Sequence, residues 1–403
     1  MITNKRRLLI GFATLVLATT LLLPRPTVAT TVTALLTGLN NPVSFKFAPD
    51  GRIFYDEKDT GNIRVILQDG TLLQQPFATV SSIFNGGEAG LLGIALDPDF
   101  QTNWYVYVYH NYRDANSYTS GNITRYTSNG NIGISPVNIL HVVSYLQNTI
   151  YHNGGYIKFG PDGDLYAQVG EFHQSQQAQN QSSNDGKMLR IRPDGSFPSD
   201  NPSPGSPIYA SGIRNAFGFD FDTTSNRLIA TEAGPSTDDE INIIVKGGNY
   251  GWPICTGPCH TPPYIDPVVD LNPVVTPTGI ATVAPNVYYF GEWNTGNLMR
   301  LELTSAGALV SMDQVFSFGP GGITGVEKRS NGGLYFSTPN GIYTYDLGTP
   351  NTQSPPQQPS PYLFYLAGLV VATSIVSIIL LTRKKWNRTP SETLTRKVPG
   401  TNA

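Results

Sequence analysis

One unit recurs along the chain and limits what it can fold into: an apolar strand, a tight turn rich in Pro, Asp, Gly or Asn, and a strand with alternating aromatic residues. Pro presets φ and Gly or Asn accepts a positive φ, as a β-hairpin turn requires. Six hairpins at roughly 40–70-residue spacing predict an all-β fold, a six-bladed β-propeller. A β-sandwich or two stacked sheets is the alternative. The six units lie at residues 47–55, 95–109, 159–166, 219–231, 287–303 and 326–345.

The composition agrees with many short strands and excludes two other fold classes. The 403 residues include 41 glycines and 31 prolines, and only 14% are charged. Long surface helices need Glu, Lys, Ala and Leu, so a coiled coil or helical bundle is excluded. Residues 30–382 carry 16 basic against 28 acidic side chains, a balance of −12. A body this acidic repels phosphate backbones, so no nucleic-acid partner is expected.

Both ends of the chain contain segments typical of export and membrane insertion. Residues 1–29 combine Lys5-Arg6-Arg7, an apolar run and a small-residue site near Ala29, which predicts a cleaved secretory signal. Residues 362–382 hold no charge and span about 31 Å as a helix, enough to cross a bilayer. The basic residues that follow at 383–388 place the tail inside by the positive-inside rule. An uncleaved anchor and a buried core helix are the respective alternatives.

The domain organisation follows from these segments. We expect a signal peptide (1–29), a propeller domain (30–348), a Pro/Gln-rich stalk (349–361), a transmembrane helix (362–382) and a basic cytoplasmic tail (383–403). The predicted location is the cell membrane, with a single pass and the propeller domain outside.

Five Gly-rich polar segments stand out, because loops at one end of a propeller channel converge and can share a site. His152 is the natural general base, since His exchanges a proton near neutrality. Arg214 offers an always-charged donor fork for an oxyanion or carboxylate. Taken singly, His152 could be structural and Arg214 part of a salt bridge between blades. The segments are 87–93, 151–155, 212–215, 232–240 and 247–253.

Two further groups suggest a metal and a crosslink. Asp238, Asp239 and Glu240 lie next to Gly234-Pro235, and such hard oxygen ligands suit Ca²⁺; a solvated acidic turn is the alternative. Cys255 and Cys259 are the only cysteines, and in an exported region they predict a loop disulfide. Their spacing is one residue too long for the Cys-x-x-Cys-His haem attachment pattern.

Across about residues 35–348 the chain resembles the PQQ-dependent glucose/sorbosone dehydrogenase family, the soluble quinoprotein aldose sugar dehydrogenases. Five motifs in the family order carry the resemblance: GEAGLLGIALDPDF (87–100), HNGGYIKFGPDGDLY (152–166), GKMLRIRPDGSFPSDNP (186–202), GIRNAFGFDFD (212–222) and EAGPSTDDEINIIVKGGNYGWP (232–253). The family fold is a six-bladed propeller, in agreement with the repeat count.

The resemblance implies a function and roles for individual residues. Family members oxidise an aldose at the anomeric carbon with pyrroloquinoline quinone (PQQ) and Ca²⁺. The sugar hydroxyl would give its proton to His152, with Arg214 near the reacting carbonyl. The resemblance assigns Glu88, Arg214 and Asn215 to the cofactor, the carbonyls of Gly234 and Pro235 to its Ca²⁺, and Glu240 and Tyr250 to a second Ca²⁺.

The chain also departs from the family pattern. Glu88 replaces a Gln, Tyr151 replaces an acid, and the late Arg-x-Arg is Gly322-Ile323-Thr324. The late Lys has no counterpart near residues 290–293. PQQ carries three carboxylates, and burying them without cations is costly. Lys328 and Arg329 are the nearest substitutes in sequence.

Three functional hypotheses therefore remain. The first is a membrane-anchored, extracellular, PQQ-dependent oxidoreductase acting on the CH–OH group of a sugar, with an unidentified electron acceptor. The second is a non-catalytic propeller that binds a glycan or protein partner outside the cell. The hedgehog-interacting protein resembles the same family and shows that this fold can bind proteins. The third is a Ca²⁺-dependent hydrolase of lactonase type, for which Glu88 and Glu171 would be the residues to test.

Overall fold

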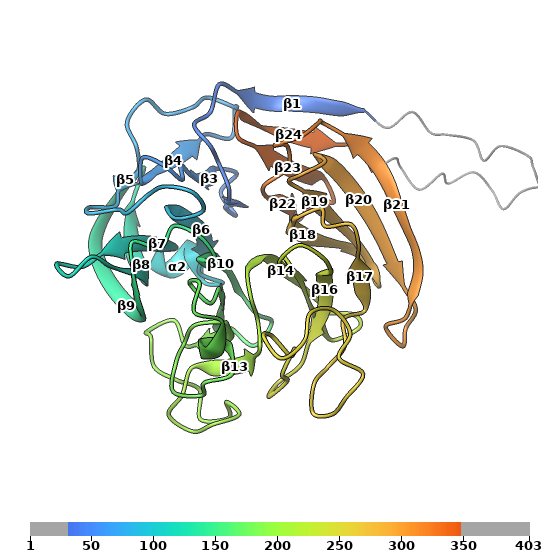
Figure 1. Ribbon diagram of the computed structural model, residues 1–403. Coiled ribbons are helices and arrows are strands. Elements are labelled where there is room, and N and C mark those ends of the chain that lie inside the picture. Colours follow the sequence, from blue (N-terminus) through green and yellow to red (C-terminus); the bar gives the residue numbers. More distant parts are fainter. Residues whose placement is uncertain (1–30, 348–403) are drawn as a thin grey trace, which may run out of the picture. The chain divides into compact units, whose positions relative to one another are not determined.

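The computed structural model describes residues 31–347, apart from the side chains of residues 143–147, and contains six four-stranded antiparallel sheets. Figure 1 shows these sheets arranged around a common centre. The predicted six-bladed β-propeller is therefore confirmed. The predicted signal peptide, stalk, transmembrane helix and tail lie outside the described residues. Within residues 31–347, no helix has the length and apolar character needed to cross a membrane.

Each blade is a meander whose first strand lies innermost. Blade 1 contains β2 (Phe45–Phe47), β3 (Ile53–Asp56), β4 (Asn62–Ile66) and β5 (Ala78–Thr79). Blade 2 contains β6 (Leu91–Leu96), β7 (Tyr105–Arg113), β8 (Tyr118–Asn129) and β9 (Ile132–Gln147). Blade 3 contains β10 (Gly154–Phe159), β11 (Leu165–Val169), β12 (Lys187–Ile191) and β13 (Ile208–Ser211).

The second half of the chain repeats this plan. Blade 4 contains β14 (Ala216–Asp222), β15 (Arg227–Glu232), β16 (Asp239–Ile244) and β17 (Val269–Leu271). Blade 5 contains β18 (Pro277–Ala284), β19 (Val287–Glu292), β20 (Asn297–Leu303) and β21 (Leu309–Ser317). Blade 6 contains β22 (Val326–Lys328), β23 (Leu334–Thr338), β24 (Gly341–Tyr345) and β1 (Val32–Thr37). Two short helices, α2 (Phe100–Asn103) and η1 (Ser175–Ala178), lie between strands.

The repeated turns form as the sequence predicts. In Pro49-Asp50-Gly51 the Asp50 carboxylate accepts the Arg52 N–H over 3.1 Å, while Gly51 has φ 91°. Gly163 has φ 81° in the matching turn of blade 3. Both values lie in the left-handed region that glycine tolerates without a steric penalty. The predicted hairpin at 287–303 joins the second and third strands of its blade (β19 and β20), because a further turn at Pro285-Asn286 precedes it.

The ring is closed by pairing the first strand with the last part of the chain. β1 pairs antiparallel with β24, with Val32 opposite Tyr345 and Thr37 opposite Gly341. Blade 6 is thus assembled from residues near both ends of the described chain. This pairing covers an edge of β24 that would otherwise be left without a partner.

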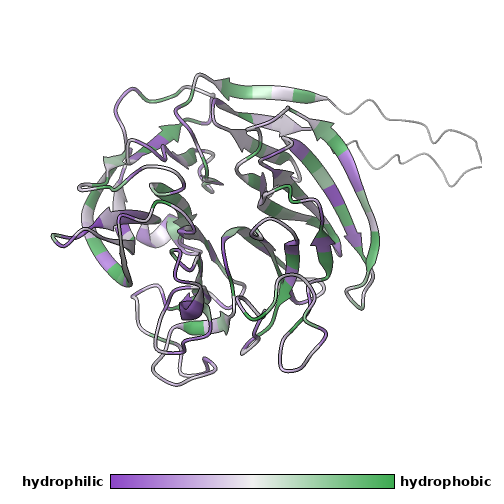
Figure 2. Ribbon diagram, in the orientation of Figure 1, coloured by the Kyte–Doolittle hydropathy of each residue, from purple (hydrophilic) through white to green (hydrophobic). Residues whose placement is uncertain are grey.

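The hydrophobic core lies between neighbouring blades. One cluster joins Tyr107 and Tyr109 of blade 2 to Ile157, Leu165 and Val169 of blade 3, all of them fully buried. Figure 2 shows hydrophobic and hydrophilic residues alternating along the outer strands β20 and β21. Because alternate side chains of a strand face opposite sides, this pattern suits strands with one buried face.

The channel between the inner strands contains a closed network of charges, which we call the channel network. Lys46 Nζ contacts Glu327 Oε1 and donates to the Tyr156 hydroxyl over 2.8 Å. Lys158 Nζ lies 2.7 Å from Asp220 Oδ1 and 3.2 Å from Glu327 Oε2. Burial alone would lower the pKa of Lys158, but the carboxylates of Asp220 and Glu327 raise it well above its ordinary value. The network ties β2, β10, β14 and β22 together.

Candidate functional site

The predicted polar segments meet at one end of the channel, which we call the mouth. The mouth is formed by loops that precede the inner strands and by loops that follow the second strand of each blade. The N–H of Glu171 donates to the carbonyl of Arg214 over 2.9 Å, and that of Ala233 donates to the carbonyl of Asn215 over 2.7 Å. These contacts bring together segments that are about 20 to 40 residues apart in sequence, as convergent propeller loops should do.

His152 is fixed at the mouth by its own backbone. Its N–H donates to Glu88 Oε2 over 2.7 Å, and its carbonyl accepts the Phe172 N–H over 3.0 Å. A Cβ on Gly170 would lie 2.2 Å from that carbonyl oxygen, so a side chain there would displace the loop. His152 has φ 55°, which is uncommon for a non-glycine residue. The surrounding contacts therefore hold the residue in a costly conformation.

The imidazole of His152 lies between a carboxylate and a guanidinium. Its Nδ1 contacts Glu171 Oε1, and its Nε2 lies 3.0 Å from Arg214 Nη2. Since Arg can only donate, the Nε2 atom accepts from Arg214 and the proton is assigned to Nδ1. The ring of His173 lies 4.1 Å from that of His152, and burial lowers the pKa of His173. This arrangement leaves the Nε2 lone pair as the basic site.

Arg214 is engaged on both terminal nitrogens. Nη1 donates to the carbonyls of Ala233 and Gly234 over 2.7 and 2.8 Å. The guanidinium also lies 5.4 Å from the Trp252 ring, a cation–π distance. Burial lowers the pKa of Arg214, yet a guanidinium keeps its charge in proteins.

Glu88 is hydrogen-bonded to Asn215, another residue that the resemblance assigns to the cofactor. Its Oε2 accepts from Asn215 Nδ2 over 3.0 Å as well as from the N–H of His152. The carboxylate is half-buried and lines the mouth cavity. The sequence prediction placed Glu88, Arg214 and Asn215 at one site, and the structure brings them together around His152.

The predicted Ca²⁺ ligands surround a second, much smaller space. Gly234, Pro235, Glu240 and Tyr250 line a cavity of about 10 Å³ behind Arg214. The Gly234 carbonyl accepts from Arg214, and the Tyr250 hydroxyl donates to the Ile243 carbonyl over 2.7 Å. Burial raises the pKa of Glu240 to about 7, while its carboxylate accepts from Asn242 and from the N–H of Gly257.

Within residues 31–347, no group of three or more His, Cys, Asp or Glu side chains is arranged to hold a metal ion. Cys255 and Cys259 form a disulfide beside this space.

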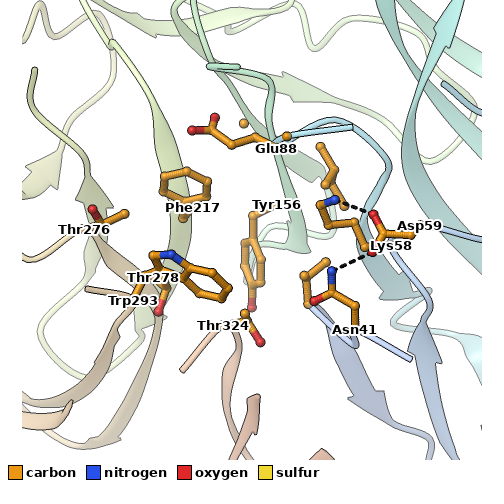
Figure 3. Close-up of a pocket in the computed structure, with 14 residues that line it drawn as sticks. Asn41, Lys58, Asp59, Glu88, Tyr156, Phe217, Thr276, Thr278, Trp293 and Thr324 are labelled. Atoms are coloured by element: carbon orange, nitrogen blue, oxygen red, sulfur yellow. Dashed lines mark hydrogen bonds and ion pairs between the residues drawn. The ribbon is translucent and has the colours of Figure 1, made fainter. Parts of the chain in front are cut away.

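A larger cavity of about 460 Å³ opens at the mouth. Figure 3 shows Glu88 on one side of it, the Lys58–Asp59 pair on a second and Trp293 on a third, with Tyr156 and Phe217 between them. Lys58 Nζ lies 2.6 Å from Asp59 Oδ1, and the side chain of Lys58 is only 11% exposed. The charged side chains lining this cavity are therefore one cation and two carboxylates.

Comparison with known proteins places this architecture in a family. Residues 39–342 match the family model described as Glucose / Sorbosone dehydrogenase. The chain belongs to the glucose/sorbosone dehydrogenase family. Quinoprotein glucose dehydrogenase B of Acinetobacter calcoaceticus is 35% identical over 254 residues, which cover 55% of this chain and 52% of that protein. The aldose sugar dehydrogenase of Escherichia coli K12 is 31% identical over 228 residues, which cover 54% of this chain and 60% of that protein.

Solved structures support the same assignment. The PQQ-bound aldose sugar dehydrogenase from Streptomyces coelicolor superposes with a TM-score of 0.69 at 30% identity, covering 80% of this chain and 99% of that structure. Hedgehog-interacting protein of mouse is 29% identical over 164 residues, which cover 35% of this chain and 22% of that protein. The match spans about half to three fifths of the two curated bacterial dehydrogenases named above.

The residues of this glucose/sorbosone dehydrogenase family member do not fit the three carboxylates of PQQ. The segments where the family has its late cations do reach the mouth cavity, but they bring Trp293 and Thr324 there. Lys328 and Arg329, the nearest substitutes in sequence, line a different cavity of about 810 Å³ with Lys46 and Lys158. Lys328 is exposed and donates to the Val283 carbonyl over 2.7 Å. The structure therefore does not bring these two nearest substitutes to the mouth.

Sequence reasoning missed Lys58, although a repeated motif could have revealed it. Glu-x-x-Thr-Gly-Asn occurs at 57–62 and again at 292–297, in both cases between the second and third strands of a blade. In each copy the Glu carboxylate accepts from the Asn amide over 2.9 Å. The residue after the Glu, Lys58 or Trp293, then lines the mouth cavity.

Proposed function

We propose that this protein oxidises an aldose at its anomeric carbon, with His152 as the general base. The observation that carries the proposal is the placement of His152 between Glu171 and Arg214, with its backbone N–H bound to Glu88, which lines the mouth cavity. A general base must lie within hydrogen-bond reach of the proton that it removes, and it works best with a third group that orients it. Its membership in a family of sugar dehydrogenases supports the choice of substrate.

The chain's own residues account for the proton transfer. The anomeric hydroxyl takes the place of Arg214 Nη2 at Nε2 of His152 and gives its proton to that atom. Glu171 holds the Nδ1 proton and stabilises the imidazolium that forms. The Nη2 atom of Arg214, displaced from His152, then donates to the sugar oxygen that becomes the carbonyl oxygen of the lactone. The reaction also needs a two-electron acceptor beside the C1–H bond, and the mouth cavity is the space open to one.

The proposed location rests on the two ends of the chain. The charged start and apolar run within residues 1–29, and the uncharged stretch at 362–382 followed by basic residues, support export with a single membrane anchor. Protease digestion of intact cells should remove the propeller domain and leave a membrane-bound fragment of the tail. A full-length chain protected in intact cells would contradict this topology.

The test of the activity is an assay of sugar oxidation with a dye as terminal acceptor. Full-length protein is offered a panel of aldoses with several quinones, and His152→Asn is assayed in parallel. We expect lactone formation that falls by about 10²–10⁴-fold in the variant, the usual contribution of a general base. Equal rates in the two proteins, or no oxidation with any acceptor, would reject the proposal.

A second candidate, non-catalytic glycan binding, is favoured by one observation. Trp293 is 38% exposed at the cavity, and an exposed indole offers a flat apolar face to a sugar ring. In that case a sugar would bind with the same affinity to wild type and to His152→Asn, and no product would form. Titration calorimetry with the same aldose panel separates the two functions.

A further inference from the structure

Two donors at the mouth, one of them on Asn215, which the resemblance assigns to the cofactor, are already occupied by the chain itself. Asn215 Nδ2 and the N–H of His152 both donate to Glu88 Oε2, over 3.0 and 2.7 Å. Glu88 therefore supplies from within the protein the negative charge that these donors would otherwise receive from a ligand. A carboxylate held by two donors is a stable arrangement that an incoming anion must displace.

The guanidinium of Arg214 is occupied in the same way. Nη1 donates to two backbone carbonyls and Nη2 to His152, which leaves Nε as the nitrogen with no partner among the described residues. That Nε is fully buried, and Arg214 is not among the residues that line the mouth cavity. Its positive charge therefore faces the carbonyls of Ala233 and Gly234 and not the cavity.

The cavity that remains is unsuited to a polyanion. Its charged side chains are Lys58, which is paired with Asp59 at 2.6 Å, and Glu88. Its other walls include three aromatic side chains, Tyr156, Phe217 and Trp293. A flat uncharged ring can pack on such walls, whereas each carboxylate brought in would lose hydration without gaining a cation.

Resting on the proposed sugar oxidation, we propose that the mouth cavity takes a quinone without carboxylate groups as its electron acceptor and that Glu88 excludes polycarboxylate quinones. The reaction balances with such a partner. The C1–H hydride passes with its two electrons to the quinone, and the hydroxyl proton leaves through His152. The sugar is oxidised to the lactone, and the quinone is reduced to the quinol after taking up one proton.

Two probes that share one ring system and differ in their carboxylate charges make the test direct. PQQ carries three carboxylates, and its trimethyl ester presents the same ring system without them. Full-length protein in detergent is titrated with each by calorimetry, for wild type and Glu88→Gln. Glu302→Gln is the matched control, because Glu302 pairs with Arg300 on β20 of blade 5 and does not line the cavity.

We expect the ester to bind wild type at least tenfold more tightly than PQQ. In Glu88→Gln the affinity for PQQ should rise about tenfold, while that for the ester stays within twofold. Glu302→Gln should match wild type with both probes. A salt titration of wild type gives a second measurement if Glu88→Gln does not fold, since screening should strengthen binding of PQQ and leave the ester unchanged.

The two proposals fail in different ways. Wild-type protein that binds PQQ as tightly as the ester, or that binds neither, would overturn the inference about the acceptor. Absence of sugar oxidation with every acceptor would overturn the proposed function. A preference for the ester in that case would still support charge selection by Glu88, because it is measured by binding alone.

Discussion

Two clusters of charged residues lie along the same channel, and they are built differently. In the channel network, Glu327 pairs with both Lys46 and Lys158, and Lys158 also pairs with Asp220. The second oxygen of Asp220 accepts the Thr282 N–H over 2.6 Å. At the mouth, Glu171 Oε2, Arg214 Nε and an oxygen of Asn215 are buried without a partner among the described residues. Both clusters adjoin a cavity, of about 460 Å³ at the mouth and about 810 Å³ at the channel network, so the difference lies in how their polar groups are paired.

The groups of the channel network hold the ring of blades together, whereas the groups at the mouth are available for chemistry. The channel network joins four inner strands through ion pairs that satisfy one another, so its side chains have little capacity left for a ligand. The mouth keeps a basic nitrogen and several buried donors and acceptors that have no partner among the described residues. Substitutions in the two clusters should therefore affect stability and activity separately.

The largest effect is expected from Glu171→Gln at the mouth. The substitution removes the charge that orients Nδ1 of His152 and stabilises its protonated form. We expect kcat/KM for sugar oxidation to fall about 10²–10⁴-fold, with the thermal midpoint nearly unchanged. Steady-state kinetics over a range of pH together with a melting curve measure both quantities. Unchanged kinetics would mean that the mouth cluster is structural, as the channel network is.

Glu327→Gln should have the opposite profile. It leaves the ammonium groups of Lys46 and Lys158 buried without their shared carboxylate. Removing one partner of a buried pair typically lowers the free energy of unfolding by about 3–5 kcal/mol. Urea denaturation measures the loss, and Glu302→Gln, which breaks an ion pair exposed on the surface, should cost under about 1 kcal/mol. Equal stability of the two variants would show that the network is not a structural element.

A third comparison concerns Asp185, which is buried near Glu171 and Lys187 and affects how stability depends on pH. Burial raises the pKa of Asp185 to about 8 and lowers that of Lys187 to about 7. Because the folded state then holds a proton that the unfolded state has lost, stability should decrease as pH rises from 4 to 7. The slope is at most about 1.4 kcal/mol per pH unit, and above pH 7 the loss of the Lys187 proton acts in the opposite direction.

Asp185→Asn should remove this slope, whereas the exposed Asp313→Asn should retain it. Urea denaturation at pH 4, 5, 6 and 7 provides the comparison. An identical slope in wild type and Asp185→Asn would assign the pH dependence to other groups.

The fold could be predicted from sequence because its repeating element is local. The turns at Pro49-Asp50-Gly51 and at 161–163 depend on the conformations of a few adjacent residues. The channel network could not be predicted in this way. Lys46, Lys158 and Glu327 lie more than 100 residues apart, and each resembles an ordinary charged residue on a strand until the ring closes.

The site could be predicted only in part, because motifs in the sequence identify its residues but not the contacts that form when distant loops meet. His152, Arg214, Asn215 and Glu88 lie in motifs whose order the resemblance supplied, and the structure brings them together. The orienting role of Glu171 depends on the path of the loop after β11 and was not predicted. Nor was the occupation of the Gly234 carbonyl by Arg214, which depends on how the loops before β14 and after β15 of blade 4 lie against each other.

The closure of the ring has a mechanical consequence. Val32 and Tyr345 are opposite one another in the ladder between β1 and β24, so the two ends of the described chain leave the propeller from the same end of one antiparallel pair. A force that separates these ends loads the ladder one hydrogen-bonded pair at a time, as in opening a zipper, and does not shear all the pairs together. Blade 6 should therefore yield first under tension, at low force, while the five blades formed from contiguous chain remain intact.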